Sequence, residues 1–373
     1  MTSAPAADSR SETEVVAHLS RLDRFLPVLI ILAMALGLIL GRTVDGLDEA
    51  LDSVKIGSVS LPIALGLLVM MYPVLAKVRY DETQRVTGDH KLLGASLFMN
   101  WILGPALMFA LAWLMLPDLP EFRTGLIIVG LARCIAMVLI WNQLACGDGE
   151  VAAVLVAVNS VFQILMYSVL GWLFLSEIPG WFGATGTELD VSMWEIAKNV
   201  LIFLGIPLAA GFLTRATLIP AKGADWYAKE FLPKIGPTAL LGLLYTIVIM
   251  FAMQGDRLLD RPFDILRIAL PMVIYFGLMF FIAFFVSKAL GFTYEETTAI
   301  SFTAAGNNFE LAIAVAVGVF GISSGEALTG VIGPLIEVPV LIALVYVALW
   351  LRDRHFPKAS SIPSGTAAPA NAR

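Results

Sequence analysis

Charged side chains are scarce in this sequence. Of its 373 residues, 14% are charged and 58% are hydrophobic, whereas a soluble globular chain has about 25% charged and about half apolar residues. The formal net charge of -6 provides no basic excess that could neutralise a phosphate backbone. These proportions argue against a soluble fold and against nucleic acid as a partner. They predict an all-α protein that crosses the lipid bilayer several times.

Cysteine and histidine are also rare. The two cysteines, Cys134 and Cys146, are too few for a disulfide framework or a four-thiolate metal site. The three histidines lie outside the apolar runs, so general-base chemistry within the membrane lacks its usual residue. A His-Glu-x-x-His motif and a pair of catalytic aspartates are also missing. We therefore expect no enzymatic activity and no cofactor.

Long apolar runs account for most of the chain. A helix needs about 20 mostly apolar residues to cross the hydrocarbon core. Ten candidate runs occur, approximately at 25–41, 59–76, 92–116, 124–145, 151–175, 194–213, 237–253, 264–287, 297–320 and 326–351. We refer to them as segments 1 to 10. Segment 1 follows a polar leader without an obvious cleavage site, which indicates a retained helix rather than a signal peptide.

Lysine and arginine are distributed unevenly between the loops. If the ten segments alternate in direction, the side that holds both termini carries Arg10, Arg21, Arg24, Lys77, Arg79, Arg85, Lys91, Arg215, Lys222, Lys229, Lys234, Lys288, Arg352, Arg354, Lys358 and Arg373. The opposite side carries Arg42, Lys55, Arg123, Arg257 and Arg261. Because cytoplasmic loops retain positive charge, we expect both termini to be cytoplasmic in a multi-pass protein of the cell (inner) membrane.

The chain shows signs of one internal repeat. Pro62 of segment 2 matches Pro237 of segment 7, and Pro105 of segment 3 matches Pro271 of segment 8 at a similar offset. This offset divides ten helices into two sets of five, and an odd number makes the repeats inverted. The predicted organisation is a disordered cytoplasmic N-terminus (1–24), a first repeat (25–175), a periplasmic loop (176–193), a second repeat (194–351) and a cytoplasmic tail (352–373).

Segments 4 and 9 correspond in the two repeats. Inverted-repeat transporters place their substrate near the midplane, between discontinuous helices in corresponding positions. Segment 4 carries Arg133 and Cys134 about ten residues from its start, and segment 9 carries Gly306-Asn307-Asn308 at the same depth. Glycine and asparagine tolerate non-helical backbone. We therefore predict that both helices are broken there.

Three formal charges lie deep inside the apolar segments. A charge at the bilayer centre is costly, so each of Arg133, Glu310 and Glu337 is a functional hypothesis by default. Glu310 would begin the second half-helix of segment 9, where a carboxylate could load and release a proton. Glu337 lies between two prolines and either joins the site or supports segment 9. Arg133 either faces the site or forms a structural bridge to a carboxylate.

The uncharged polar residues allow two interpretations each. A lone buried cysteine usually acts as a small apolar side chain, but a neighbouring arginine and a helix break would favour Cys134 as a thiolate, which binds soft metalloids. Cys146 lies about 18 Å further along a helix and cannot share that ligand. Asn159 and Gln163 share one helix face. They either line a cavity for a hydroxylated solute or hold helices together.

Four stretches together resemble a known transporter family. Residues 131–142, 159–163, 304–314 and 333–339 are similar to the arsenical-resistance arsenite efflux permeases of the bile acid/arsenite/riboflavin transporter superfamily. The resemblance extends from about residue 22 to residue 357. It implies a ten-helix carrier with a panel and a core domain, in which broken helices 4 and 9 cross within the core. The essential cysteine and glutamate of the family fall on Cys134 and Glu310.

The resemblance and the deep polar residues together give one functional prediction. The chain is expected to export arsenite, and antimonite as a further substrate, as a metalloid/proton antiporter by alternating access. The predicted substrate-binding residues are Cys134 (the metalloid ligand), Asn159, Gln163, Asn307 and Asn308. The predicted proton-coupling residues are Glu310, Glu337 and Arg133. The alternative is a sodium-coupled organic anion symporter of the bile acid carrier type on the same fold.

Overall fold

The computed structural model describes most of the apolar part of the chain. It covers residues 26–44, 46–47, 55–56, 59–77, 89–135, 137–181, 192–260, 262–322 and 324–356. The predicted N-terminal segment 1–24, most of the loop 176–193 and most of the tail 352–373 lie outside these residues. Within them, the chain is helical apart from an isolated bridge and a short antiparallel hairpin of β1 (Lys55–Ile56) and β2 (Val59–Ser60).

The helices follow the predicted apolar segments closely. Their bounds are α3 (Leu26–Thr43), α5 (Leu61–Ala76), α7 (His90–Phe98), α8 (Gly104–Met115), α9 (Pro120–Leu131), α10 (Met137–Leu144), α11 (Gly149–Trp172), α12 (Ile178–Trp181), α13 (Met193–Val200), α14 (Ile206–Lys222), α15 (Ala224–Trp226), α16 (Leu232–Asp260), α17 (Pro262–Ala289), α18 (Tyr294–Ala305), α19 (Phe309–Phe320) and α20 (Gly325–His355). Segments 4 and 9 are interrupted as predicted, between α9 and α10 and between α18 and α19.

Six continuous helical runs among the described residues are long and apolar enough to cross a membrane. They are His90–Met115, Gly149–Trp181, Met193–Lys222, Ala224–Met253, Ile265–Ala289 and Gly325–His355. Shorter apolar helices occur at Val28–Thr43, Ala64–Ala76 and Phe309–Phe320. Many large apolar side chains on these helices are exposed on the outside of the protein, where lipid would cover them. The chain is therefore a polytopic membrane protein.

In each of four of these runs, a single wide turn of π-helix joins two α-helices. The turns are η1 (Met99–Leu103), η2 (Leu173–Glu177), η3 (Leu201–Gly205) and η4 (Tyr227–Phe231). Each turn is followed two residues later by a proline: Pro105, Pro179, Pro207 and Pro233. A proline has no N–H for the carbonyl four residues earlier, and its ring clashes with that carbonyl. The preceding turn therefore widens, and the helix continues beyond the proline.

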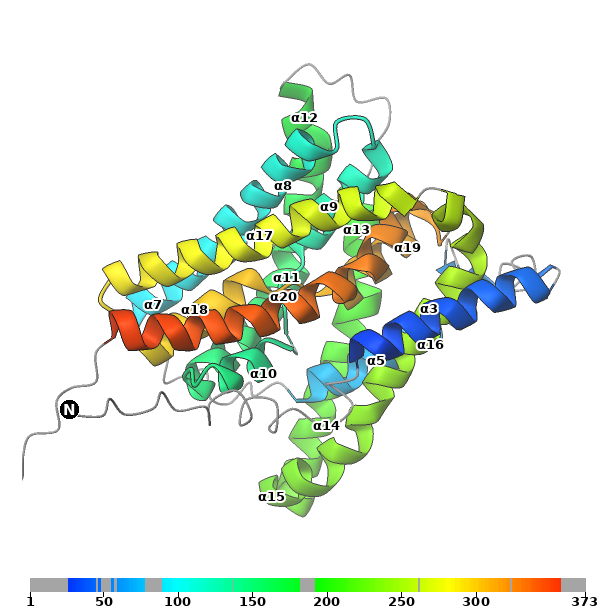
Figure 1. Ribbon diagram of the computed structural model, residues 1–373. Coiled ribbons are helices and arrows are strands. Elements are labelled where there is room, and N and C mark those ends of the chain that lie inside the picture. The colour runs from blue at the N-terminus through cyan, green and yellow to red at the C-terminus, as the bar shows by residue number, and fades with distance from the viewer. Residues whose placement is uncertain are drawn as a thin grey trace, which may run out of the picture.

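The helices pack as two groups. We call α3, α5, α14 and α16 the panel group, because α16 packs against α3 and α5 and α14 packs against α5. The core group contains α7 to α11 and α17 to α20, in which α17 contacts α8, α18 and α20 and α9 contacts α8 and α20. Figure 1 shows α17 and α20 running side by side, with α3 and α16 in a separate layer. Helix α13 contacts α11 and α19 of the core group, and it continues through η3 into α14 of the panel group.

Two glycines bring α3 directly against α16 in the panel group. Gly37 and Gly41 are four residues apart and so lie on one face of α3. A Cβ atom at Gly37 would lie 2.5 Å from the Val248 carbonyl oxygen, and one at Gly41 would lie 2.1 Å from that of Ala252. Small residues at this spacing let membrane helices approach backbone to backbone. The close contact makes α3 and α16 one packed unit.

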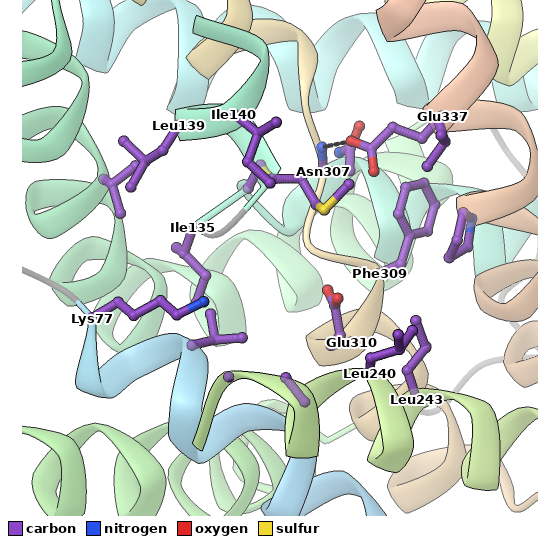
Figure 2. Close-up of a pocket in the computed structure, with 18 of the residues that line it drawn as sticks. Lys77, Ile135, Leu139, Ile140, Leu240, Leu243, Asn307, Phe309, Glu310 and Glu337 are labelled. Atoms are coloured by element: carbon purple, nitrogen blue, oxygen red, sulfur yellow. Dashed lines mark hydrogen bonds between the residues drawn. The ribbon is translucent and has the colours of Figure 1, made fainter. Parts of the chain in front are cut away.

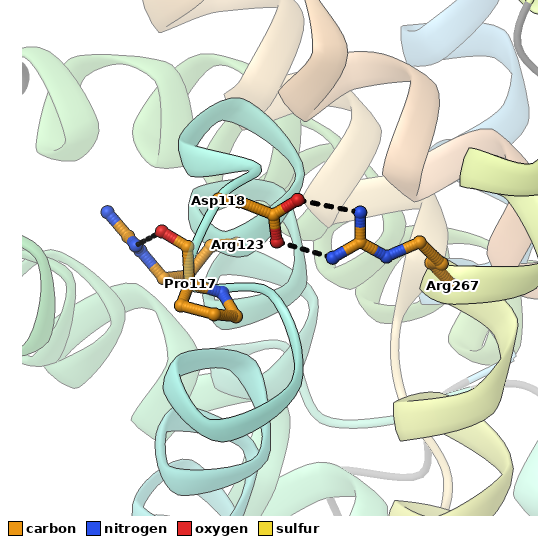
Figure 3. Close-up of polar contacts among 4 residues, drawn as sticks. All are labelled: Pro117, Asp118, Arg123 and Arg267. Atoms are coloured by element: carbon orange, nitrogen blue, oxygen red, sulfur yellow. Dashed lines mark hydrogen bonds and ion pairs between the residues drawn. The ribbon is translucent and has the colours of Figure 1, made fainter.

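One exposed ion pair ties the α8–α9 loop to α17. Asp118 in the loop accepts two hydrogen bonds from the Arg267 guanidinium, one of them 2.8 Å long between Nη1 and Oδ2 (Figure 3). On the other side of the loop, Arg123 donates to the Pro117 carbonyl oxygen at 3.1 Å and covers the Trp113 ring. The hydrogen bonds from Arg267 hold the pKa of the Asp118 carboxyl below its ordinary value.

This ion pair makes the thermal stability depend on pH. An unfolded aspartate has a pKa of about 3.9. Because the folded pKa of Asp118 is lower, the pair stabilises the fold above about pH 4, and the stabilisation disappears as the pH falls through the folded pKa. We expect Asp118→Asn to lower the melting temperature slightly at neutral pH and to have no effect under strongly acidic conditions. The effect is small because the pair is exposed and screened.

The measurement is a double-mutant cycle of Asp118→Asn and Arg267→Gln. The melting temperature of each protein is measured in detergent over a series of pH values. The two single variants should be equally destabilised at neutral pH, and the double variant should resemble either of them. A coupling between the two positions that survives at the acidic end of the series would contradict this account.

Candidate functional site

The two helix interruptions lie against each other. Arg133 and Asn307 form an isolated antiparallel bridge. On either side of it, the Cys134 N–H donates to the Gly306 carbonyl oxygen at 3.2 Å, and the Asn308 N–H donates to the Ala132 carbonyl oxygen at 3.1 Å. Backbone groups released by the two breaks therefore satisfy each other, which is a requirement for non-helical backbone away from water.

The two asparagines of segment 9 complete the helix ends at this junction. Asn307 Nδ2 donates to the carbonyl oxygens of Val129 at 2.8 Å and Ala132 at 3.1 Å, at the carboxyl end of α9, where carbonyl groups lack the regular helical donor four residues later. Asn308 Oδ1 accepts from the Leu311 N–H at 3.0 Å and so caps the amino end of α19. Asn307 uses only its amide donor here and Asn308 only its amide acceptor, because Asn307 Oδ1 and Asn308 Nδ2 are buried without a hydrogen-bond partner among the described residues.

Glu337 of α20 supports the junction from a third helix. Its Oε1 accepts a hydrogen bond of 3.1 Å from the Asn307 backbone N–H, and its side chain is buried. Gly306 packs between these groups and segment 4, because a Cβ atom there would lie 2.9 Å from the Cys134 Cβ. The backbone at Gly306 is extended and open to any residue (φ -72°). The close approach of Cys134, and not the backbone conformation, therefore explains why position 306 holds a glycine.

A cavity of about 730 Å³ opens beside the junction. Its walls come from both interruptions and from α5, α10, α11, α16, α19 and α20, so it lies between the panel and core groups. The lining includes Met70, Val74, Lys77, Cys134, Ile135, Met137, Ile140, Leu240, Leu243, Asn307, Phe309, Glu310 and Glu337. Figure 2 shows the carboxylates of Glu310 and Glu337 on one side of it and the Lys77 amine on the other.

Four of the predicted site residues line this cavity together. They are Cys134, Asn307, Glu310 and Glu337. Cys134 is 3% exposed, and neither cysteine of the chain forms a disulfide. Glu310 is half-buried in the first turn of α19. The amino end of α10 is also at the cavity, since Met137 lines it. The amino ends of helices carry partial positive charge, and both α10 and α19 begin at this side of the junction.

Four of the predicted site residues are not among those that line the cavity: Arg133, Asn159, Gln163 and Asn308. Asn308 caps α19, as described. Asn159 accepts from the Trp101 indole N–H at 3.0 Å, and Gln163 Oε1 accepts from the Arg133 backbone N–H at 2.8 Å. Both amides are buried and bind protein groups, which corresponds to their alternative role of holding helices together.

Arg133 is fully buried and has neutral partners. Its guanidinium donates to the Tyr275 hydroxyl at 2.8 Å, to the Ala304 carbonyl oxygen at 3.4 Å and to the Gly130 carbonyl oxygen. Among the described residues no carboxylate lies within ion-pairing distance of it. The bridge to a carboxylate that the sequence suggested is therefore replaced by contacts with carbonyl and hydroxyl oxygens.

Two residues at the site were not identified from the sequence. Lys77 counted only as one of the positive loop charges, but it directly follows α5 and reaches the cavity. Tyr275 lies in the apolar middle of α17 and is fully buried against Arg133. The available signal for Tyr275 was a hydroxyl at mid-depth in a membrane helix, which needs a polar partner.

Substitution of Glu337 tests its contact with the Asn307 backbone. Glu337→Leu leaves that buried N–H without an acceptor, which should cost about 1–3 kcal/mol of stability. Glu337→Gln keeps an acceptor oxygen at the same distance from the backbone and should cost much less. The measurement is thermal or denaturant unfolding of the purified protein in detergent.

Glu326→Gln at the far end of the same helix serves as a control for loss of a carboxylate. If Glu337→Gln were as damaging as Glu337→Leu while Glu326→Gln was harmless, then the charge of Glu337, and not its hydrogen bond, would be what stabilises the junction.

Known proteins resemble this chain over most of its length. A family model described as the Sodium Bile acid symporter family matches residues 64–261. The Arsenical-resistance protein Acr3 of Corynebacterium glutamicum is 57% identical over 348 residues, which covers 93% of this chain and 94% of the relative. The protein of the same name from Alkaliphilus metalliredigens is 30% identical and covers 90% and 94%, respectively. An Uncharacterized transporter of Synechocystis sp. (slr0944) is 33% identical, covering 88% of each.

The helical architecture and the matched family model define a membrane transporter of the Sodium Bile acid symporter family. Within this family, the sequence identity to the two Acr3 proteins and the share of each chain that is covered show to which group the chain belongs. The chain belongs to the arsenical-resistance Acr3 family, which confirms the resemblance noted from the four sequence stretches.

Proposed function

We propose that this protein exports arsenite, with antimonite as a further substrate, from the cytoplasm by exchanging it for protons. The observation that carries the proposal is that Cys134 and Glu310, from two different interrupted helices, line one cavity. The relatives named for arsenical resistance support the substrate. A soft sulfur ligand and a carboxylate at one cavity are what a metalloid/proton exchange requires.

The proposed topology is two inverted five-helix repeats with both termini in the cytoplasm. In this arrangement α3, α5, the run α7–α8, the pair α9/α10 and the run α11–α12 form the first repeat. The run α13–α14, then α16, α17, the pair α18/α19 and α20 form the second. The interrupted pair is fourth in each repeat, and the excess of lysine and arginine on the side of the termini supports the orientation.

The cavity faces the cytoplasm in this topology. Its lining extends from the junction to Lys77, Gln143 and Gly147, which lie at helix ends on the side rich in positive charge. Towards the opposite side, α19 packs tightly on α13: a Cβ atom at Gly318 would lie 2.0 Å from Asn199 Oδ1. This contact separates the junction from the exterior. The described conformation is then the one that loads arsenite.

Cys134 acts as the metalloid ligand in this mechanism. At neutral pH arsenite is the uncharged acid As(OH)₃, which enters the cavity without a counter-ion. The Cys134 sulfur replaces one hydroxyl group and forms an As–S bond, and the displaced hydroxyl leaves as water with the thiol proton. Neither arsenic nor sulfur changes oxidation state. A single sulfur ligand keeps the bond reversible, and water releases the substrate on the outside by the reverse step.

Glu310 acts as the proton carrier. Its carboxylate points into the cavity from the amino end of α19 (Figure 2), where it binds a proton that enters from outside and releases it into the cytoplasm. Proton and metalloid then occupy different states of one cycle, and each state is favoured by the ligand that it binds better. Glu337 and Asn307 form the rest of the polar wall and keep the junction in place while the cavity changes sides.

Replacement of Cys134 tests the ligand role. Cys134→Ala should reduce arsenite uptake into everted membrane vesicles to the level of vesicles without the protein, because no other thiol lines the cavity among the residues described for it. Cys146→Ser is the matched control, since that thiol is exposed outside the cavity, and it should transport at the wild-type rate. Wild-type flux in Cys134→Ala, at equal amounts of protein, would eliminate the ligand role.

Replacement of Glu310 tests proton coupling. In sodium-free everted vesicles, an imposed pH gradient should accelerate arsenite uptake by the wild type but not by Glu310→Gln, because the amide binds no proton. Glu150→Gln, on the exposed first turn of α11, should respond as the wild type does. An unchanged gradient response in Glu310→Gln would rule out this role. Sodium-driven uptake of an organic anion by the wild type would favour the symporter alternative instead.

A further inference from the structure

The guanidinium of Arg133 is enclosed by the carboxyl ends of two half-helices. Gly130 and Ala304, whose carbonyl oxygens accept its hydrogen bonds, lie in the last turns of α9 and α18. Carbonyl groups in a last turn have no partner within their own helix. The Tyr275 hydroxyl from α17 completes a set of oxygen atoms around the two terminal nitrogens. Such an oxygen-rich enclosure is a binding site for a cation.

The charges at this point balance. The carboxyl end of a helix carries about half a negative elementary charge. Two such ends meet here, so about one positive charge neutralises them, and one guanidinium supplies it. Among the described residues no carboxylate contributes to this balance. Arg133 therefore neutralises backbone dipoles rather than an acidic side chain.

The core group is shaped to hold this side chain. Gly104 at the start of α8 leaves the space, because a Cβ atom there would lie 2.7 Å from Arg133 Nη1 and 3.1 Å from the Tyr275 hydroxyl. Gln163 of α11 fixes the Arg133 backbone. The contacts come from α8, α9, α11, α17 and α18 and involve no helix of the panel group. Arg133 Nε is buried without a partner, so the enclosure is fitted to the charged tip of the side chain.

We propose that Arg133 is a permanent, covalently attached counter-ion that takes the place of a bound inorganic cation at the junction. Its charge holds the two carboxyl ends together in every state of the cycle, and it makes transport independent of sodium. The transport part of this inference rests on the proposed function, whereas the ion-binding part does not. The guanidinium is thus a positioning group that determines ion specificity, and it takes no part in proton transfer.

The test removes the tethered charge and offers free cations in its place. Arg133→Ala leaves a cavity with the same oxygen atoms. Its melting temperature in detergent should be well below that of the wild type in choline chloride, and about 10 mM guanidinium should restore a large part of the difference. Denaturation by guanidinium requires molar concentrations, so this dose is not denaturing. Sodium should stabilise the variant to a smaller extent, since oxygen atoms also bind hard alkali cations.

Arsenite flux in vesicles that contain Arg133→Ala should be at least about tenfold below that of the wild type. The same cations should restore this flux. Arg123→Ala is the matched control, since Arg123 lies in the first turn of α9, the helix that ends just before Arg133. Neither its stability nor its flux should respond specifically to guanidinium, and an equal concentration of urea should be without effect. If no cation stabilises folded Arg133→Ala more than it stabilises Arg123→Ala, the proposal is wrong.

A second pair of variants keeps the test decisive if Arg133→Ala does not fold. Arg133→Lys retains the charge, and Arg133→Met has similar length without it. Arg133→Lys should yield more folded protein, and its transport should be independent of sodium. If Arg133→Lys and Arg133→Met lost folded protein and transport to the same extent, the shape of the side chain alone would matter and the proposal would be overturned. Failure of the wild type to transport arsenite would instead contradict the proposed function and would leave the thermal measurements of ion binding valid.

Discussion

The antiparallel contact between the two helix interruptions is the interaction on which the site depends. Neither interruption could persist alone at this depth, because each exposes backbone groups that lipid and apolar side chains cannot satisfy. Paired, they exchange hydrogen bonds on both sides of the Arg133–Asn307 bridge. The asparagine side chains then complete the nearest helix ends. A polar, non-helical region is thereby held rigidly in an otherwise apolar protein.

This junction also separates electric charge. The carboxyl ends of α9 and α18 face Arg133, which is buried and does not line the cavity. The amino ends of α10 and α19 face the cavity, beside Cys134 and Glu310. The positive charge of Arg133 is therefore confined to the protein interior, and positive helix ends are presented to the groups that would bind metalloid or proton. The same four half-helices produce both effects.

The sequence predicted the interruptions because their cause is local. Gly306, Asn307 and Asn308 are poor helix formers within an apolar run, and the deep charges nearby required polar partners. Which of these residues face the cavity was not predictable in the same way. Asn159 and Gln163 share a helix face as expected, but the neighbours of that face, Trp101 and the Arg133 backbone, come from elsewhere in the chain.

The role of Arg133 was missed for a related reason. An arginine in a membrane segment is expected to seek a carboxylate, since side-chain charges are visible in a sequence. Here the compensating charge comes from peptide dipoles at two helix ends, and these exist only once both helices have broken and met. Each of the four wide turns occurs just before a proline. Other prolines inside helices, such as Pro73 and Pro271, are not preceded by a wide turn, so the missing N–H alone does not predict one.

The division into two helix groups decides how the cavity could change sides. Cys134, Asn307, Glu310 and Glu337 all belong to the core group, so relative movement of the groups would leave their mutual geometry intact. Lys77 and Leu240 belong to the panel group and would slide past them. In such a movement α3 and α16 would stay together, because Gly37 and Gly41 hold α3 backbone to backbone on α16. Changing access then requires new contacts only at the apolar surface between the groups, and the hydrogen bonds at the junction need not break.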